Sequence, residues 1–173
     1  MKPDPIVVVA GSRALAPGLA PRLLVRFLAG LPSEATILLR RGLFRQPNLF
    51  EAQVESLCEL IGLKVEWCYP LFGAAQKPGT TGPAVDWEEK GYRGRQMTFA
   101  RDLDMVTRAD LVLAFYTIDQ VGDDTSGTVG LVEKALEANR VVYAYALTDN
   151  RVTRVGEHDP TNEWADRVPF ALG

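Results

Sequence analysis

The sequence predicts an α/β fold: a Rossmann-like three-layer α/β/α arrangement around a five-stranded parallel sheet in the order 3-2-1-4-5. Two observations lead to this prediction. Five short segments rich in apolar residues recur along the 173 residues, and the first of them is a continuous apolar run without polar alternation, as in a strand that is buried on both faces of a parallel sheet. Segments with apolar residues at helical spacing separate these runs, and strands that alternate with helices imply right-handed crossovers.

The five strands are predicted at residues 6–10, 35–39, 63–68, 111–115 and 141–145. The first is a continuous run of mostly β-branched residues that ends at Gly11, which favours a strand in the middle of the sheet. The third is stopped by Pro70, because proline cannot donate a hydrogen bond to a ladder.

Helices are predicted between the strands, at about 19–28, 48–62, 95–108 and 127–138. The helix over 48–62 has the clearest boundaries, because Asn48 can cap it, Glu51 follows three residues later and Gly62 can close it. The stretch from 71 to 94 is rich in Gly, Pro and Thr. It is too long for a plain connection, and such long loops are often functional.

The length fits one domain, residues 1–173, with 148–173 as a polar, weakly patterned tail that packs on the body through Trp164 and Phe170. The net charge of −3 argues against a protein that coats nucleic acid, since such proteins usually present a basic surface. No apolar run is long enough to span a membrane and no signal peptide is evident, so we expect a cytoplasmic protein.

Metal and redox chemistry find little support in the sequence. Cys58 and Cys68 lack Cys-x-x-Cys spacing and have no histidine cluster nearby, so we interpret them as buried thiols of a helix and a strand. His158 is the single histidine, and we interpret it as a solvated loop residue, with a catalytic base as the alternative. We therefore expect no metal and no cofactor.

The predicted strand order locates a ligand site before any motif is considered. Strands 1 and 4 are neighbours whose connections leave in opposite directions, and ligands of such sheets bind beyond the carboxyl ends of the strands at this switch point. The site should therefore involve Gly11-Ser12-Arg13 after the first strand and the loop 123–128 after the fourth.

The loop Thr125-Ser126-Gly127-Thr128 carries the strongest local signal for phosphate binding. Backbone N–H groups and the dipole at a helix start favour an anion, and glycine permits close approach. The hydroxyls of Ser126 and Thr128 add two donors. Simple capping of the helix by one of these hydroxyls is the alternative interpretation.

Residues around this loop can contact the rest of the ligand. Arg13 would pair with the phosphate, and a solvated surface cation is its alternative. Trp87 and Arg95 would close over the ligand from the long loop, although Trp87 can equally pin that loop to the core. Cleavage of an N-glycosidic bond would need a carboxylate near the ribose, because the transition state is oxocarbenium-like. The candidate carboxylates are Asp104, Asp124 and Glu133.

Three stretches carry a family resemblance: Val7 through Arg13; Trp87 with 91–97 and 109–115; and Ser126-Gly127-Thr128 with 135–142. Together they resemble the SLOG superfamily of Rossmann-like nucleotide-binding proteins. This group includes the LOG-type cytokinin-activating phosphoribohydrolases, the DNA-processing protein DprA and the YspA-like domains. The resemblance covers roughly residues 6–145. It implies a nucleotide-derived ligand held by the GSR and SGT loops, and it suggests a homodimer.

The catalytic glutamate of the LOG-type PGGxGTxxE motif has no counterpart here. Leu131 stands at its place, and Glu133 comes two positions late. The leading hypothesis is therefore a module that senses or sequesters a small nucleotide-derived molecule, with neither nucleic acid nor membrane as partner. One alternative is an N-glycosidic hydrolase or transferase that acts on nucleoside 5′-monophosphates. Another is a DprA-like binder of single-stranded nucleic acid.

Overall fold

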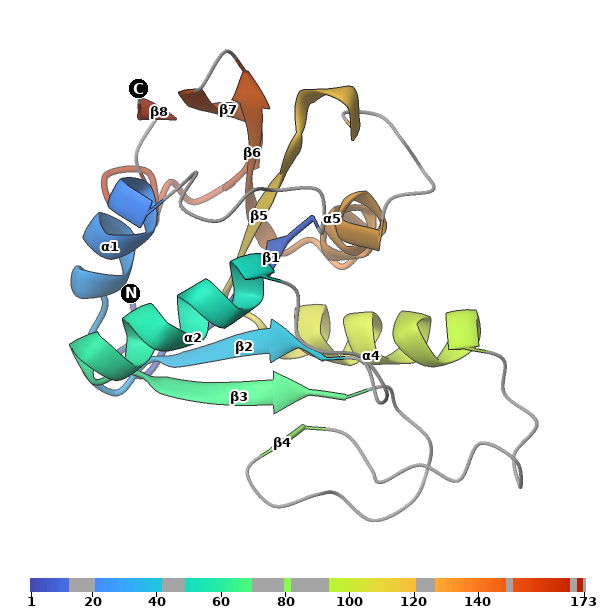
Figure 1. Cartoon of the computed structure of the whole chain (residues 1–173), viewed down its shortest axis with the longest axis horizontal. Helices are drawn as coiled ribbons and strands as arrows, with labels where there is room; N and C mark the ends of the chain where they lie inside the picture. Colours follow the sequence, from blue (N-terminus) through green and yellow to red (C-terminus); the bar gives the residue numbers. More distant parts are fainter. Residues whose placement is uncertain are drawn as a thin grey trace.

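The computed structural model describes residues 1–12, 21–41, 49–69, 80–81, 94–120, 127–148, 151–168 and 171–172 (Figure 1). In chain order its elements are β1 (Ile6–Gly11), α1 (Pro21–Ala29), β2 (Thr36–Arg40), α2 (Leu49–Ile61), β3 (Lys64–Cys68), β4 (Thr80–Thr81), α4 (Gly94–Arg108), β5 (Leu111–Thr117), the 3-10 helix η1 (Ile118–Gln120), α5 (Gly127–Glu137), β6 (Val141–Thr148), β7 (Arg151–His158) and β8 (Ala171–Leu172).

All the described strands belong to one sheet, in the order β4-β3-β2-β1-β5-β6-β7-β8. Pairing is parallel from β4 through β6 and antiparallel from β6 through β8. The five strands predicted from apolar runs correspond to β1, β2, β3, β5 and β6, and their predicted order is confirmed. In this order β1 and β5 are neighbours in the middle of the sheet, with Gly11 beside Phe115 in register.

The predicted number of five strands is wrong. Six described strands have five residues or more, and the two-residue strands β4 and β8 extend the sheet further. The sixth long strand is β7, which lies in the segment expected to be a weakly patterned tail. Only Val152 of β7 is buried, and the other side chains are half-buried or exposed. A strand with so little apolar content gives no run that a sequence pattern can detect.

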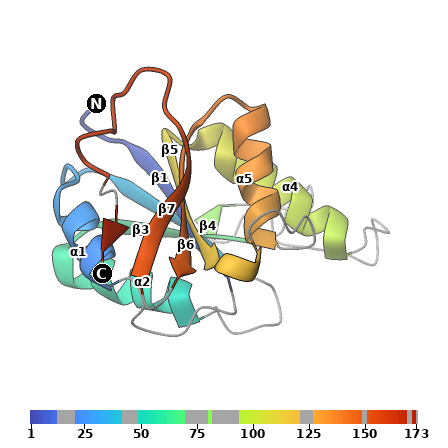
Figure 2. The ribbon, with the colours of Figure 1, turned by 90° about the horizontal axis from the view of Figure 1, so that it is seen from above.

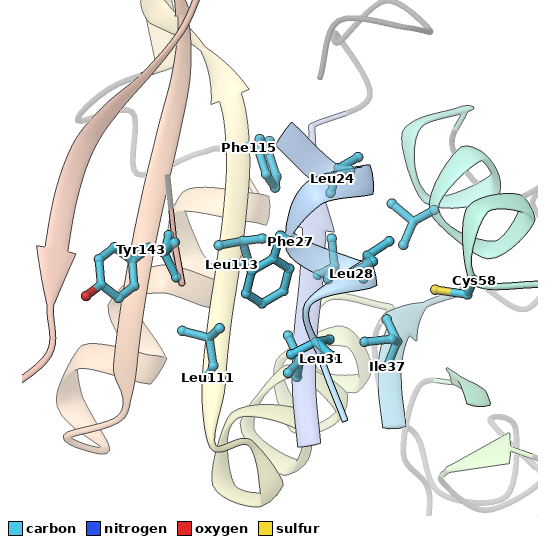
Figure 3. Packing of buried hydrophobic residues seen from close by; sticks show 14 of the residues in the cluster. Leu24, Phe27, Leu28, Leu31, Ile37, Cys58, Leu111, Leu113, Phe115 and Tyr143 are labelled. Atoms are coloured by element: carbon cyan, nitrogen blue, oxygen red, sulfur yellow. The ribbon is translucent and has the colours of Figure 1, made fainter. Parts of the chain in front are cut away.

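Helices cover both faces of the sheet, as strand alternation requires. Val7 and Val9 of β1 pack in the cluster that contains α1 and α2, whereas Val8 and Ala10 pack in the cluster that contains α4 and α5. Figure 2 shows these two helix pairs on opposite sides of the sheet. Figure 3 shows the first cluster, in which side chains of α1 and Cys58 of α2 pack on side chains of the sheet.

The segment after β7 completes the first of these clusters. Trp164 is fully buried, with its ring 6.3 Å from that of Phe27 in α1. Asp159 fixes the approach to it by accepting hydrogen bonds from the Tyr143 hydroxyl and the Trp164 backbone N–H, both at 2.9 Å. The predicted anchoring role of Trp164 is thus confirmed, while Phe170 lies outside the described residues.

The predictions for the two cysteines and for the histidine have different outcomes. Cys58 and Cys68 are free, buried thiols in α2 and β3, as predicted. His158 does not lie in a loop; it is the last residue of β7, and its Nε2 lies 2.8 Å from Oδ1 of Asn139. Across the parts of the chain that the structure describes, no helix combines the length and apolar character that a membrane crossing needs.

Candidate functional site

Buried polar side chains gather near the carboxyl ends of the central strands. Ser12 directly follows β1, Glu51 lies in the first turn of α2, and Thr128 is the second residue of α5. Arg101 and Asp102 of α4 complete the buried polar residues within the described ranges. Because burying a polar group is costly unless it is bonded, such a concentration needs a network of partners.

Arg40, the last residue of β2, forms the centre of that network. Its Nε donates to Glu51 Oε1 at 3.0 Å, and its Nη2 donates to the Gly11 carbonyl at 3.0 Å and to Thr128 Oγ1 at 3.1 Å. The side chain is only 10% exposed. One guanidinium group therefore connects the end of β1, the start of α2 and the start of α5.

Burial and charge pairing act against each other at Arg40. Burial alone would lower the pKa of its guanidinium, but the attraction of Glu51 and Asp102 outweighs it, and the pKa lies above its usual value. Burial also raises the pKa of the Glu51 carboxyl, with Arg40 opposing this shift. Since an arginine stays protonated under all ordinary conditions, the Arg40 guanidinium keeps its positive charge.

A second buried ion pair lies next to the first. Arg101 Nε donates to Asp102 Oδ1 at 2.9 Å, and Arg101 Nη1 reaches the carbonyl of Arg41 at 3.4 Å. These contacts join α4 to the end of β2. The two arginines and the two carboxylates balance each other, so the cluster as a whole is neutral and differs from a plain basic patch.

The amino end of α5 lies directly beside Arg40. A Cβ atom built on Gly127 would be 3.8 Å from Arg40 Nη1. The described residues supply no acceptor to this Nη1, whereas Nε and Nη2 are both bonded. Backbone N–H groups of the first helical turn and one arm of a fixed guanidinium therefore occupy the same small region, which is the donor set that an anion needs.

Gly11 is required by packing as well as by position. A Cβ atom at this residue would lie 2.1 Å from Cδ1 of Phe50, whose ring packs 5.0 Å from that of Phe115. The absence of a side chain thus lets α2 approach the end of β1. The next residue continues the ladder, because the Ser12 N–H donates to the Phe115 carbonyl at 2.9 Å.

The structure brings together part of the predicted site. Gly11 and Thr128 are bonded to the same guanidinium, and Ser12 and Gly127 are their direct neighbours in sequence. Arg95 lies in the first turn of α4. Four predicted residues of the site lie outside the described residues; they are Arg13, Trp87, Asp124 and Ser126.

Two predicted catalytic carboxylates lie apart from the Arg40 network. Asp104 is in the carboxyl-terminal half of α4, 3.9 Å from Arg108, which also binds Glu66 at 2.9 Å. Burial raises the pKa of the Asp104 carboxyl, and Arg108 opposes the shift. Glu133 is exposed on α5.

The residues that sequence reasoning missed are Arg40 with Glu51 and Arg101 with Asp102. Glu51 carries a signal as a capping residue, but nothing in its neighbourhood indicates a buried ion pair. Arg40 only marks the end of an apolar run. An arginine directly after a predicted inner strand, in a sheet with a site at that edge, is the one signal that points to it.

Comparison with protein-family models gives no match for this chain, and comparison with curated proteins gives none either. The resemblance to the SLOG superfamily therefore stays a prediction, and the functional argument below starts from the geometry of the site.

Proposed function

We propose that this chain binds a nucleotide, or a nucleotide-derived phosphate ligand, at the switch point between β1 and β5, and that it acts as a sensing or sequestering module of Rossmann-like three-layer fold. The observation that carries the proposal is Arg40, a guanidinium nine-tenths buried and placed beside Gly127 at the start of α5. The site takes the phosphate, and the rest of the ligand extends along the strand ends.

The physical argument rests on fixed donors. The hydrogen bonds to Glu51, Gly11 and Thr128 hold the Arg40 guanidinium in one orientation, so binding costs little side-chain entropy. A charge-assisted hydrogen bond from Nη1 adds to the N–H groups and dipole of α5. The cluster is neutral overall, and within the described residues the Arg40 Nη1 group is its one donor directed at the ligand. Such a site selects a small anion at a defined place, whereas a diffuse basic surface would attract any polyanion.

Binding is supported better than N-glycosidic cleavage. Among the described residues, the buried carboxylates near this edge are Glu51 and Asp102, and each is paired with an arginine, whereas Asp119 of η1 is exposed. Asp104 and Glu133 lie elsewhere, on the flanks of α4 and α5. Each of these carboxylates already accepts a hydrogen bond from its arginine, so its position is set by that pair rather than by a ribose.

The test is a binding series on the purified chain by isothermal titration calorimetry. The probes are ribose 5-phosphate, a panel of nucleoside 5′-monophosphates and the matching nucleosides, with free base followed by chromatography. We expect the phosphate esters to bind and the nucleosides to bind at least tenfold more weakly, since one or two charge-assisted bonds are lost. Arg40→Lys should weaken all the phosphate esters alike.

Equal affinity for nucleosides and their monophosphates would overturn the proposal, as would the absence of any binding. Release of free base with turnover would show that the chain is an N-glycosidic enzyme and would contradict the binding module. Thermal unfolding of Arg40→Lys is the control, because a variant that unfolds early would lose its ligand for a structural reason.

A further inference from the structure

Three half-buried side chains form a stack beside the Arg40 network. Arg41 follows β2, Trp67 lies near the end of β3, and Tyr69 directly follows β3. The guanidinium carbon of Arg41 lies 5.7 Å from the centroid of the Trp67 ring and 5.9 Å from that of the Tyr69 ring. Both distances are in the range of a cation–π interaction.

This stack is held in place from several sides. The Arg41 N–H donates to the Cys68 carbonyl at 2.9 Å, and the Arg41 carbonyl accepts from Arg101. The indole N–H of Trp67 donates to the Glu55 carboxylate of α2. A long surface arginine is ordinarily mobile, so its fixed backbone and its contacts with two rings make this one preorganised.

The stack lies at the same edge of the sheet as the phosphate site. Arg40 pairs with Cys68 in the β2–β3 register, so Arg41 and Tyr69 follow side by side at the strand ends. From the end of β1 to the end of β3 is two strand spacings, about 10 Å. A nucleoside monophosphate spans such a separation between its phosphate and its base.

We propose that Arg41, Trp67 and Tyr69 form the base subsite of the ligand and that this subsite favours purines. The inference rests on the proposed function, since it places the base relative to the phosphate bound at Arg40 and α5. Guanidinium planes and aromatic rings are the surfaces on which proteins stack nucleobases. A purine offers a larger π surface than a pyrimidine and gains more from the stack.

The experiment compares Arg41→Lys and Tyr69→Leu with the wild-type chain. Lysine keeps the charge and removes the planar guanidinium, and leucine keeps apolar bulk and removes the ring. The probes are adenosine 5′-monophosphate, uridine 5′-monophosphate and ribose 5-phosphate. Each variant should weaken adenosine 5′-monophosphate roughly 5- to 100-fold, the range expected for the loss of one stacking partner. Ribose 5-phosphate should change by less than about twofold, because the Arg40 site is intact.

Fluorescence gives a second readout at the stack itself. Adenosine 5′-monophosphate should quench the tryptophan emission of the wild-type chain, and Trp67→Phe should abolish that change while it retains binding, because phenylalanine still stacks. Unchanged purine affinity in Arg41→Lys and Tyr69→Leu, with ribose 5-phosphate still bound, would overturn the base subsite alone. If the wild-type chain binds none of the three probes, the proposed function and the subsite both fail.

Discussion

Replacement of Gly127 by aspartate separates the stability of α5 from its capacity to bind an anion. Gly127 is exposed at the first position of the helix, and a Cβ atom added there meets no atom closer than Arg40 Nη1 at 3.8 Å. Its φ is not in the left-handed region, unlike that of Gly62. A side chain is therefore accommodated without strain, and a carboxylate at this position lies next to the place proposed for the phosphate.

The two expected effects of Gly127→Asp have opposite signs. A carboxylate in the first helical turn interacts favourably with the helix dipole, by about 0.3–1 kcal/mol, and replacing glycine restricts the unfolded chain. The free energy of unfolding should rise by about 0.5–1.5 kcal/mol. A ligand phosphate about 5 Å from the new carboxylate would be repelled by about 1–3 kcal/mol per unit charge, at an effective dielectric between that of a protein surface and that of water. Ligand affinity should therefore fall about 5- to 150-fold.

The assay pairs urea unfolding with calorimetric titration of a nucleoside 5′-monophosphate. Gly127→Asn is the matched control, because asparagine has the same size and lacks the charge. Wild-type affinity in Gly127→Asp would refute the placement of the phosphate at α5. Equal losses in the aspartate and asparagine variants would show that bulk rather than charge excludes the ligand.

Three further predictions concern the residues that support the site. Gly11→Ala should cost about 1–3 kcal/mol or more, because its Cβ would meet Phe50 at 2.1 Å; adding Phe50→Leu should give a double variant less destabilised than the sum of the single changes in urea unfolding. Trp164→Ala should cost about 3–5 kcal/mol by the same measurement, since a fully buried indole leaves a cavity beside Phe27. Burial, aided by a nearby carboxylate, raises the pKa of the Cys58 thiol to about 12 from an ordinary value of 9.0. The folded chain then keeps a proton that the unfolded chain loses, so the free energy of unfolding should fall as the pH rises above about 9, less steeply in Cys58→Ala.

The parallel part of the fold could be predicted because its central strands, β1 and β5, are buried on both faces. The predicted strands at 6–10, 111–115 and 141–145 are continuous apolar runs, and alternation of strands with helices leaves few possible orders. The same reasoning fails for β7, since this antiparallel strand buries only Val152 fully and is recognised only through its pairing with β6. Its sequence from Arg151 to His158 contains no run that distinguishes it from a loop.

The residues of the site also fall into those that the sequence could predict and those that it could not. Gly11 and Thr128 could be placed near each other because the strand order alone brings the ends of β1 and β5 together. The Arg40–Glu51 pair could not, because it depends on how α2 packs over the end of β1, and no sequence spacing encodes that packing. Charged residues next to an apolar run are usually solvated, so their burial becomes evident only in three dimensions.

The end of β2 is the feature that connects the two proposed subsites. Successive residues of a strand point to opposite faces of a sheet. Arg40 donates to Glu51 of α2 and to Thr128 of α5, and Arg41 lies over the ring of Trp67. The two adjacent arginines can thus bind the phosphate and the base at separate positions. A change in the backbone at this strand end should disturb both subsites together, whereas a change in either side chain should disturb only one.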